Sequence, residues 1–130
     1  MRGIAITALA IFASTGALAE GVFGVWQTEK KEDGRYLQVE VHPCAEKPEQ
    51  VCGTIAGAFD GANTANVGKP IIWDMVPDGA NKWDDGKIWK VDEDEVYDSG
   101  MKLRDDGTLK VSGCILGGLI CKSQTWTPVK

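Results

Sequence analysis

The sequence has little of the chemistry on which most enzymes and nucleic-acid-binding proteins depend. Its 130 residues include one histidine, His42, and four cysteines, and they contain no glycine-rich nucleotide loop. A single histidine excludes metal sites built from several histidines. The net charge is −5 and no basic cluster is present, so nucleic acid and anionic lipid surfaces are poor partners. A chain of this length forms one domain rather than two separate cores.

Long hydrophobic runs are also missing after residue 19. The run at the start of the chain, Ile4–Phe12, is shorter than the roughly 20 residues that span a bilayer. It follows Arg2 and precedes Ala17-Leu18-Ala19, the small-x-small pattern that a signal peptidase cleaves. We therefore expect residues 1–19 to be a signal peptide and residues 20–130 to form one processed domain, periplasmic or secreted, with no membrane span. A buried core helix is the alternative for this segment.

Four cysteines in an exported domain favour disulfides over metal ligands, and neither close pair has zinc-finger spacing. The sequence alone permits three pairings, but the local geometry favours one. A two-residue turn at Gly117-Gly118 places Cys114 opposite Cys121, at a separation that a disulfide can bridge. Cys44 and Cys52 flank a short polar loop that contains a proline. We therefore expect the disulfides Cys44–Cys52 and Cys114–Cys121.

Turn signals divide the processed chain into short segments of β-type composition. The signals are Asp33-Gly34, Pro77-Asp78-Gly79, Asp85-Gly86, Asp106-Gly107 and Gly117-Gly118. The segments between them are Phe23–Glu29, Arg35–Val41, Val51–Phe59, Lys87–Val91, Val96–Leu103, Thr108–Cys114 and Cys121–Thr127, with a weaker one at Lys69–Trp73. Strands at this spacing predict an antiparallel sandwich or barrel.

The last three predicted strands can be aligned from the alternation of their side chains. A three-residue turn at Asp105–Gly107 sets Leu103 opposite Leu109, because glycine suits the left-handed last position of such a turn. The same alignment, continued through the next hairpin, gives one largely apolar face. This face carries Tyr97, Met101, Leu103, Leu109, Val111, Ile115, Ile120, Lys122, Gln124 and Trp126.

Lys122 and Gln124 stand out on this apolar face. Buried polar groups need partners, so the two residues imply a ligand, a buried acid or an error in the register. The simpler explanation is a bulge after Cys121 that turns both to solvent, or a lysine that extends to the rim of the sheet. The functional hypothesis is that both line a pocket and orient a polar group of a ligand.

Several short segments, in this order along the chain, resemble a known family. They are Gly24-Val25-Trp26, Cys52-Gly53-Thr54-Ile55, Gly68-Lys69-Pro70-Ile71, Trp83, Gly86-Lys87-Ile88-Trp89, Tyr97, Leu109-Lys110-Val111-Ser112-Gly113-Cys114 and Gln124-Thr125-Trp126-Thr127. The chain is similar to the bacterial domain-of-unknown-function family 2147, whose members are small exported proteins with calycin-type, lipocalin-like β-barrels. The resemblance implies an all-β antiparallel barrel of about eight strands over residues 20–130. It implies no activity, because the family has none that is settled.

Arrangements that could carry catalysis are weak in this sequence. His42 precedes Pro43 at a predicted strand end, and no nucleophile motif accompanies it. The carboxylates that could form a glycosidase pair lie in predicted turns, where acids usually stay hydrated. We therefore expect no enzyme activity, no cofactor and no metal site.

A barrel of about eight strands is either filled by its own side chains or holds one small ligand. We expect the interior to bind a small, largely apolar ligand, such as a fatty acid. The residues predicted to line this site are Tyr97, Met101, Val111, Ile115, Ile120, Lys122, Gln124 and Trp126. The alternative is an accessory module of the cell envelope that binds glycan or protein through a rim formed by Trp73, Trp83 and Trp89.

The predicted hairpin tip, Ile115–Ile120, is apolar on both faces. Exposing its four aliphatic side chains would forgo about 1.5–3 kcal/mol of burial for each. We therefore expect the tip to be covered, either folded across the barrel mouth or docked on a partner or ligand. Of the two, we predict that it closes one end of the barrel, with Ile115 and Ile120 facing the interior.

Overall fold

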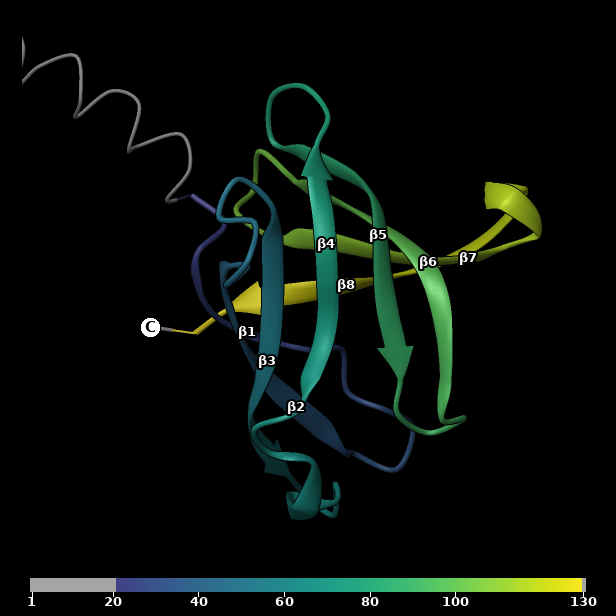
Figure 1. The fold of residues 1–130 in the computed structure, drawn as a ribbon. Helices are drawn as coiled ribbons and strands as arrows, with labels where there is room; N and C mark the ends of the chain where they lie inside the picture. Colours follow the sequence, from purple (N-terminus) through teal and green to yellow (C-terminus); the bar gives the residue numbers. More distant parts are fainter. Residues whose placement is uncertain (1–20, 130) are drawn as a thin grey trace, which may run out of the picture.

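The computed structural model describes residues 21–129, which form a closed barrel of eight antiparallel strands (Figure 1). The strands are β1 (Gly24–Gln27), β2 (Tyr36–Pro43), β3 (Val51–Phe59), β4 (Pro70–Pro77), β5 (Lys82–Lys90), β6 (Glu95–Leu103), β7 (Leu109–Ile115) and β8 (Ile120–Pro128). Two 3₁₀ turns, η1 (Thr64–Asn66) and η2 (Leu116–Gly118), interrupt the connections. The all-β barrel that was predicted is confirmed.

The predicted signal peptide falls on residues that lie outside the described part of the chain. Within residues 21–129, no helix is long and apolar enough to cross a bilayer.

The register of the last three strands is the predicted one. Leu103 pairs with Leu109, and Met101 pairs with Val111. In the next ladder Val111 pairs with Gln124 and Gly113 with Lys122, and no bulge interrupts β7 and β8. A bulge after Cys121, one of the two simpler explanations for the polar residues, is therefore wrong, whereas Lys122 is exposed, in agreement with the other one.

Both predicted disulfides are present. Cys44 and Cys52 are joined across the connection between β2 and β3, with their Cα atoms 5.0 Å apart. Cys114 and Cys121 are joined across the β7–β8 hairpin, with their Cα atoms 4.1 Å apart. Because the second disulfide joins directly paired residues, it locks the register of that hairpin.

The two ends of the barrel differ, and the strand directions define them. The connections β1–β2, β3–β4, β5–β6 and β7–β8 lie at one end, which we call the open end, and the other connections lie at the closed end. Buried apolar side chains fill the closed half of the barrel. They include Val22, Val41, Val51, Met75, Trp83, Met101 and Leu109. Trp26 adds its indole, which donates a hydrogen bond of 2.9 Å to the carbonyl of Val22.

The predicted turn at Asp85-Gly86 is wrong, because both residues lie inside β5. The ladder between β5 and β6 shifts register between Trp83 and Gly86, so these residues form a bulge. Asp85 has a φ of 58°, a left-handed conformation that aspartate tolerates better than most residues. A bulge and a turn use the same residue types, which is why the sequence pattern did not distinguish them.

We expect Gly86→Ala to destabilise the protein by about 1–3 kcal/mol, the usual cost of overpacking a well-filled core. A Cβ at this position would lie 2.5 Å from the Met75 Sδ and 2.9 Å from the Trp73 carbonyl oxygen. Urea unfolding measures the effect. Gly113→Ala is the matched control, because its Cβ would meet nothing closer than 3.5 Å. Equal stability of the two variants would contradict the tight packing at the bulge.

Candidate functional site

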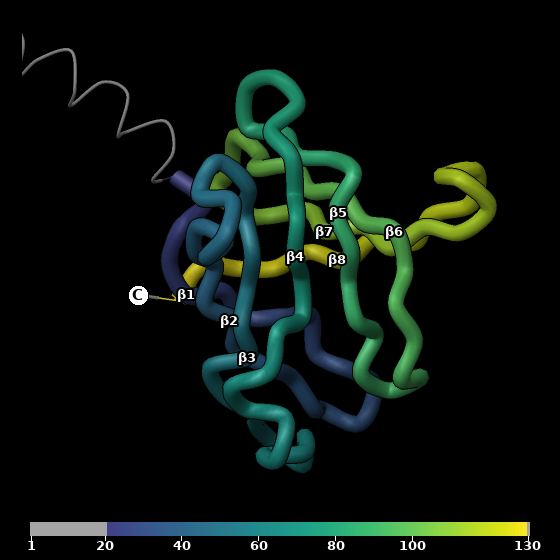
Figure 2. Tube along the Cα trace, in the orientation of Figure 1, coloured from purple at the N-terminus to yellow at the C-terminus, as the bar shows by residue number. Residues whose placement is uncertain are grey.

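The open half of the barrel contains a cavity of about 740 Å³. The β1–β2, β3–β4 and β5–β6 connections contribute to its wall, and Figure 2 shows them at the lower end of the barrel, whereas β7 and β8 contribute residues of the strands themselves. The apolar part of the lining consists of Leu37, Ile71, Ile88, Trp89, Val91, Val111, Ile115, Ile120 and Trp126. This volume lies within the roughly 300–1,000 Å³ of typical small-molecule sites. The barrel is therefore filled in its closed half and hollow in its open half.

Seven of the eight residues predicted to line the interior do line this cavity. They are Tyr97, Val111, Ile115, Ile120, Lys122, Gln124 and Trp126. Met101 is the exception, since it is buried in the core and does not contribute to the lining. It shares the inward face of β6, but it lies near the closed end, where side chains fill the barrel. Contact of these residues with a ligand remains a prediction.

The two polar residues on the apolar face differ in their surroundings. The Gln124 side-chain oxygen accepts a hydrogen bond of 2.8 Å from the Trp126 indole, so it fixes the orientation of the ring at the cavity floor. Lys122 lies nearer the open end and is exposed. Both line the cavity, as the functional hypothesis required.

The mouth of the cavity carries more positive than negative charge, although the chain as a whole is acidic. Its cations are Lys30, Lys31, Arg35, Lys90 and Lys122, and its acids are Glu29, Asp92 and Glu93. Most of these charged groups already form ion pairs with one another or with neighbouring residues. Asp92 lies 2.7 Å from the Lys31 ammonium and 3.5 Å from the Arg35 guanidinium. Among the described residues, Lys30 and Lys122 have no ion pair within 4.0 Å, but the Lys30 ammonium lies 5.3 Å from the centre of the Tyr36 ring.

The acids at the mouth are held by neutral donors as well as by cations. Glu29 accepts a hydrogen bond of 2.6 Å from the Thr125 backbone N–H. The Tyr97 hydroxyl donates to Glu93, which lowers the pKa of this carboxyl, and the charges of Lys90 and Lys122 act in the same direction. The same hydrogen bond raises the pKa of Tyr97. An anionic group that enters the mouth therefore meets Lys122 as the least engaged cation.

The sequence did not reveal the contribution of the β1–β2 connection. Lys30, Lys31 and Arg35 line the mouth from a segment that was predicted as the end of one strand, a turn and the start of the next. Asn66 of η1 also lines the cavity and is buried, and its side-chain oxygen accepts a hydrogen bond from the Lys69 ammonium. Side-chain alternation locates cavity residues on strands, but it carries no such signal for loops.

The predicted tryptophan rim is not formed. Trp83 is 9% exposed and belongs to the core at the closed end, so its assignment to a rim is wrong. Trp89 lines the cavity at the other end of the same strand, and its indole donates to the Asp94 carboxylate at 3.0 Å. Trp73 is half-buried on β4. The three rings do not form one surface because β5 carries two of them to opposite ends of the barrel.

The prediction that the hairpin tip folds across the barrel mouth is also wrong. Leu116 and Leu119 are 68% and 81% exposed, and Ile115 and Ile120 are 43% and 50% exposed. In Figure 1 the tip, η2, projects from the barrel wall instead of folding across its mouth. Ile115 and Ile120 do reach the cavity lining, so this part of the prediction agrees with the structure.

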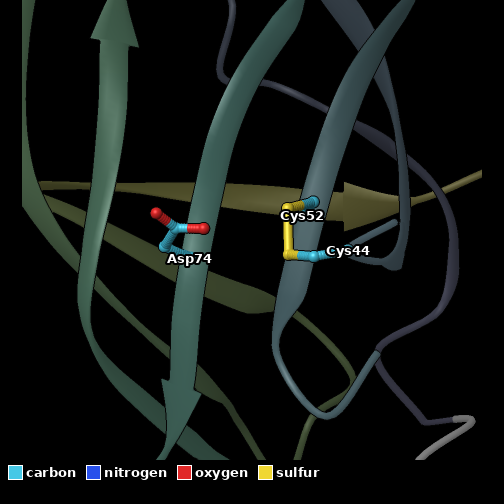
Figure 3. A group of neighbouring side chains, drawn as sticks. All are labelled: Cys44, Cys52 and Asp74. Atoms are coloured by element: carbon cyan, nitrogen blue, oxygen red, sulfur yellow. A yellow bond between two sulfur atoms is a disulfide. The ribbon is translucent and has the colours of Figure 1, made fainter. Parts of the chain in front are cut away.

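Two groups with the composition of metal or catalytic sites have other roles. Cys44, Cys52 and Asp74 have ligand-type atoms within 4.8 Å of one another, but Figure 3 shows the two sulfur atoms bonded together. A disulfide offers no thiolate to a metal ion. His42 has hydrogen-bond partners at both ring nitrogens, the Pro43 carbonyl and the Thr54 hydroxyl, each at 2.8 Å. It does not line the cavity.

Comparisons with known proteins support this architecture. No curated protein matches the chain in sequence. A solved structure of protein HP1028 from the human pathogen Helicobacter pylori, described as belonging to the lipocalin family, has a similar fold. It is 15% identical, with a TM-score of 0.67, over 84% of this chain and 83% of that one. At this identity the similarity concerns the fold alone.

The resemblance noted in the sequence is confirmed by the family comparison. The family model for an uncharacterized protein conserved in bacteria, DUF2147, matches residues 24–128. These residues include all eight strands of the barrel. The chain therefore belongs to the DUF2147 family, and its fold is a lipocalin-like β-barrel.

Proposed function

We propose that the protein binds, without catalysis, a small and largely apolar ligand with an acidic end, such as a fatty acid, inside the barrel. The hollow open half, with its apolar wall and cationic mouth, is the observation that supports this proposal. An apolar chain would lie against Leu37, Ile71 and Val111, which removes its surface from water. Its acidic group would lie at the mouth beside Lys122.

Binding without catalysis is supported by the composition of the cavity wall. Among the described residues, the lining contains no histidine and no cysteine. Ser123 lines the cavity, but its hydroxyl is hydrogen-bonded to the Ser112 hydroxyl at 2.9 Å rather than to a base. A hydroxyl without a base is a weak nucleophile.

Two measurements test the proposal. Native mass spectrometry of the purified protein is expected to show a bound small molecule, released on unfolding. Titration of delipidated protein with cis-parinaric acid, a fluorescent fatty acid, is expected to saturate at one molecule per barrel. Failure of cis-parinaric acid and of fatty acids of other lengths to bind would contradict the proposal.

We expect Lys122→Met to weaken binding of a fatty acid about threefold to tenfold, in line with the loss of one charge-assisted contact at a partly exposed site. Methionine retains much of the length of the lysine stem but removes the charge. Binding of the corresponding fatty alcohol, which has no carboxylate, is the control and should stay unchanged. Equal losses for acid and alcohol would show that Lys122 acts through packing rather than charge.

We also propose that the processed protein begins at Glu20 and is periplasmic or secreted. The two disulfides support an oxidising compartment, because disulfides persist there and are rare in the cytosol. The intact mass of protein from the periplasmic or secreted fraction is expected to match residues 20–130. Full-length protein recovered from the cytoplasm would contradict this location.

A further inference from the structure

The β7–β8 hairpin ends in an exposed apolar tip, which we define as residues 115–120, Ile-Leu-Gly-Gly-Leu-Ile. None of its side chains is polar, and its four aliphatic side chains are between 43% and 81% exposed. Figures 1 and 2 show the tip extending from the barrel as a narrow projection. Exposure of this much aliphatic surface in a single protruding element indicates an interaction site.

The apolar tip is rigidly presented. The Cys114–Cys121 disulfide joins its two strands at the base, and Ile115 pairs with Ile120 directly above it. The turn is closed by a hydrogen bond of 3.2 Å from the Leu119 N–H to the Leu116 carbonyl. This cross-link holds the two strands together at the base of the tip, so the aliphatic side chains are presented on a hairpin of fixed register.

The apolar tip is also continuous with the cavity. It lies at the open end, and Ile115 and Ile120 belong both to the tip and to the cavity lining. An aliphatic surface therefore leads from the exposed leucines into the barrel.

We infer that the apolar tip inserts into the surface of a lipid bilayer and holds the cavity mouth against the membrane. A narrow convex tip made of leucine and isoleucine lacks the tryptophan, tyrosine and arginine that carry most protein–protein binding energy. It also offers no side-chain hydrogen bond to a partner. The acyl chains of a bilayer pack against aliphatic side chains without requiring a particular orientation. Shallow insertion at the boundary between headgroups and acyl chains leaves the backbone of the turn near the hydrated headgroups.

The charge distribution bears on the kind of bilayer. No charged side chain lies between residues 111 and 121, whereas the whole chain carries a net charge of −5. Attraction therefore comes from the apolar tip, because the cationic cavity mouth that would face the bilayer offsets the repulsion between an anionic surface and the acidic remainder of the protein. We expect binding to neutral phosphatidylcholine membranes, with little change when anionic lipid is added. Docking would let the cavity exchange its ligand with the membrane. This purpose rests on the proposed function, whereas the docking itself does not.

Flotation of delipidated protein with phosphatidylcholine vesicles tests the inference. The wild-type protein is expected to float with the vesicles. The double variant Leu116→Asp, Leu119→Asp is expected to lose at least tenfold in partition coefficient. Ala45→Asp, Thr127→Asp is the matched control, because it adds the same two charges at exposed positions near the closed end and should partition like wild type. Circular dichroism and cis-parinaric acid binding confirm that the tip variant keeps its fold and cavity.

Three results would overturn the inference. These are a wild-type protein that does not float, a tip variant that floats as well as wild type, and a wild-type dimer that the tip variant abolishes. The last would show that a second copy of the chain covers the tip. Val111→Trp separates the inference from the proposed function, because it should impair cis-parinaric acid binding and leave flotation unchanged. A Val111→Trp protein that binds the fatty acid normally contradicts the cavity site but not the membrane docking.

Discussion

Replacement of Trp126 by alanine is expected to destabilise the protein by about 3–5 kcal/mol, the range for large-to-small changes in a core. Trp126 is fully buried and is the largest of the side chains that solvent does not reach. Its ring lies between the filled half of the barrel and the cavity, so its removal would merge the new void with the existing one. Equilibrium unfolding in urea, with circular dichroism as the probe, measures the loss.

Trp73→Ala is the matched control for this change. Trp73 is half-buried on β4, so the same truncation is expected to cost less, on the order of 1–2 kcal/mol. Equal losses for the two tryptophans would contradict the assignment of Trp126 to the core of the barrel.

Val111→Trp is expected to reduce the affinity for cis-parinaric acid by at least about tenfold, which corresponds to about 1.4 kcal/mol. Val111 is 1% exposed and points into the barrel at the boundary of the cavity. A tryptophan there has empty space to enter, so it fills the volume that the ligand would use. The fold should persist, and fluorescence titration measures the change in affinity.

Val96→Trp controls for the added indole. Val96 is 52% exposed, so the ring would lie outside the barrel and the affinity should stay at the wild-type value. If Val111→Trp bound cis-parinaric acid as tightly as Val96→Trp, the fatty acid would have to bind elsewhere on the protein.

The strand pairings could be predicted because local chemistry determines them. Gly107 fixed the turn length before β7, and this length decided that Leu103 would face Leu109. The pairing of Cys114 with Cys121 followed in the same way from the residues between them. In each case the controlling interaction lies within a few residues of the predicted contact.

The sequence did not predict the features that depend on the position of a residue along the barrel axis. Met101 and Val111 are paired neighbours on one inward face, yet only Val111 borders the cavity. Where the filling ends is set by Trp126 and by side chains from other strands, and no local pattern contains that information. The exposure of Leu116 and Leu119 was missed because burial was expected to outweigh every other requirement for aliphatic side chains.

The ladder that closes the barrel has a consequence for how the chain folds. It aligns only two residue pairs, Trp26 with Pro128 and Gln27 with Thr127, which are separated by at least 100 positions along the chain. The other ladders join consecutive strands, so each can form after closing a short loop. We therefore expect the hairpins between consecutive strands to form first and the pairing of β1 with β8 to form last. Early intermediates would expose the edges of β1 and β8, which makes this final joining the step most vulnerable to association between chains.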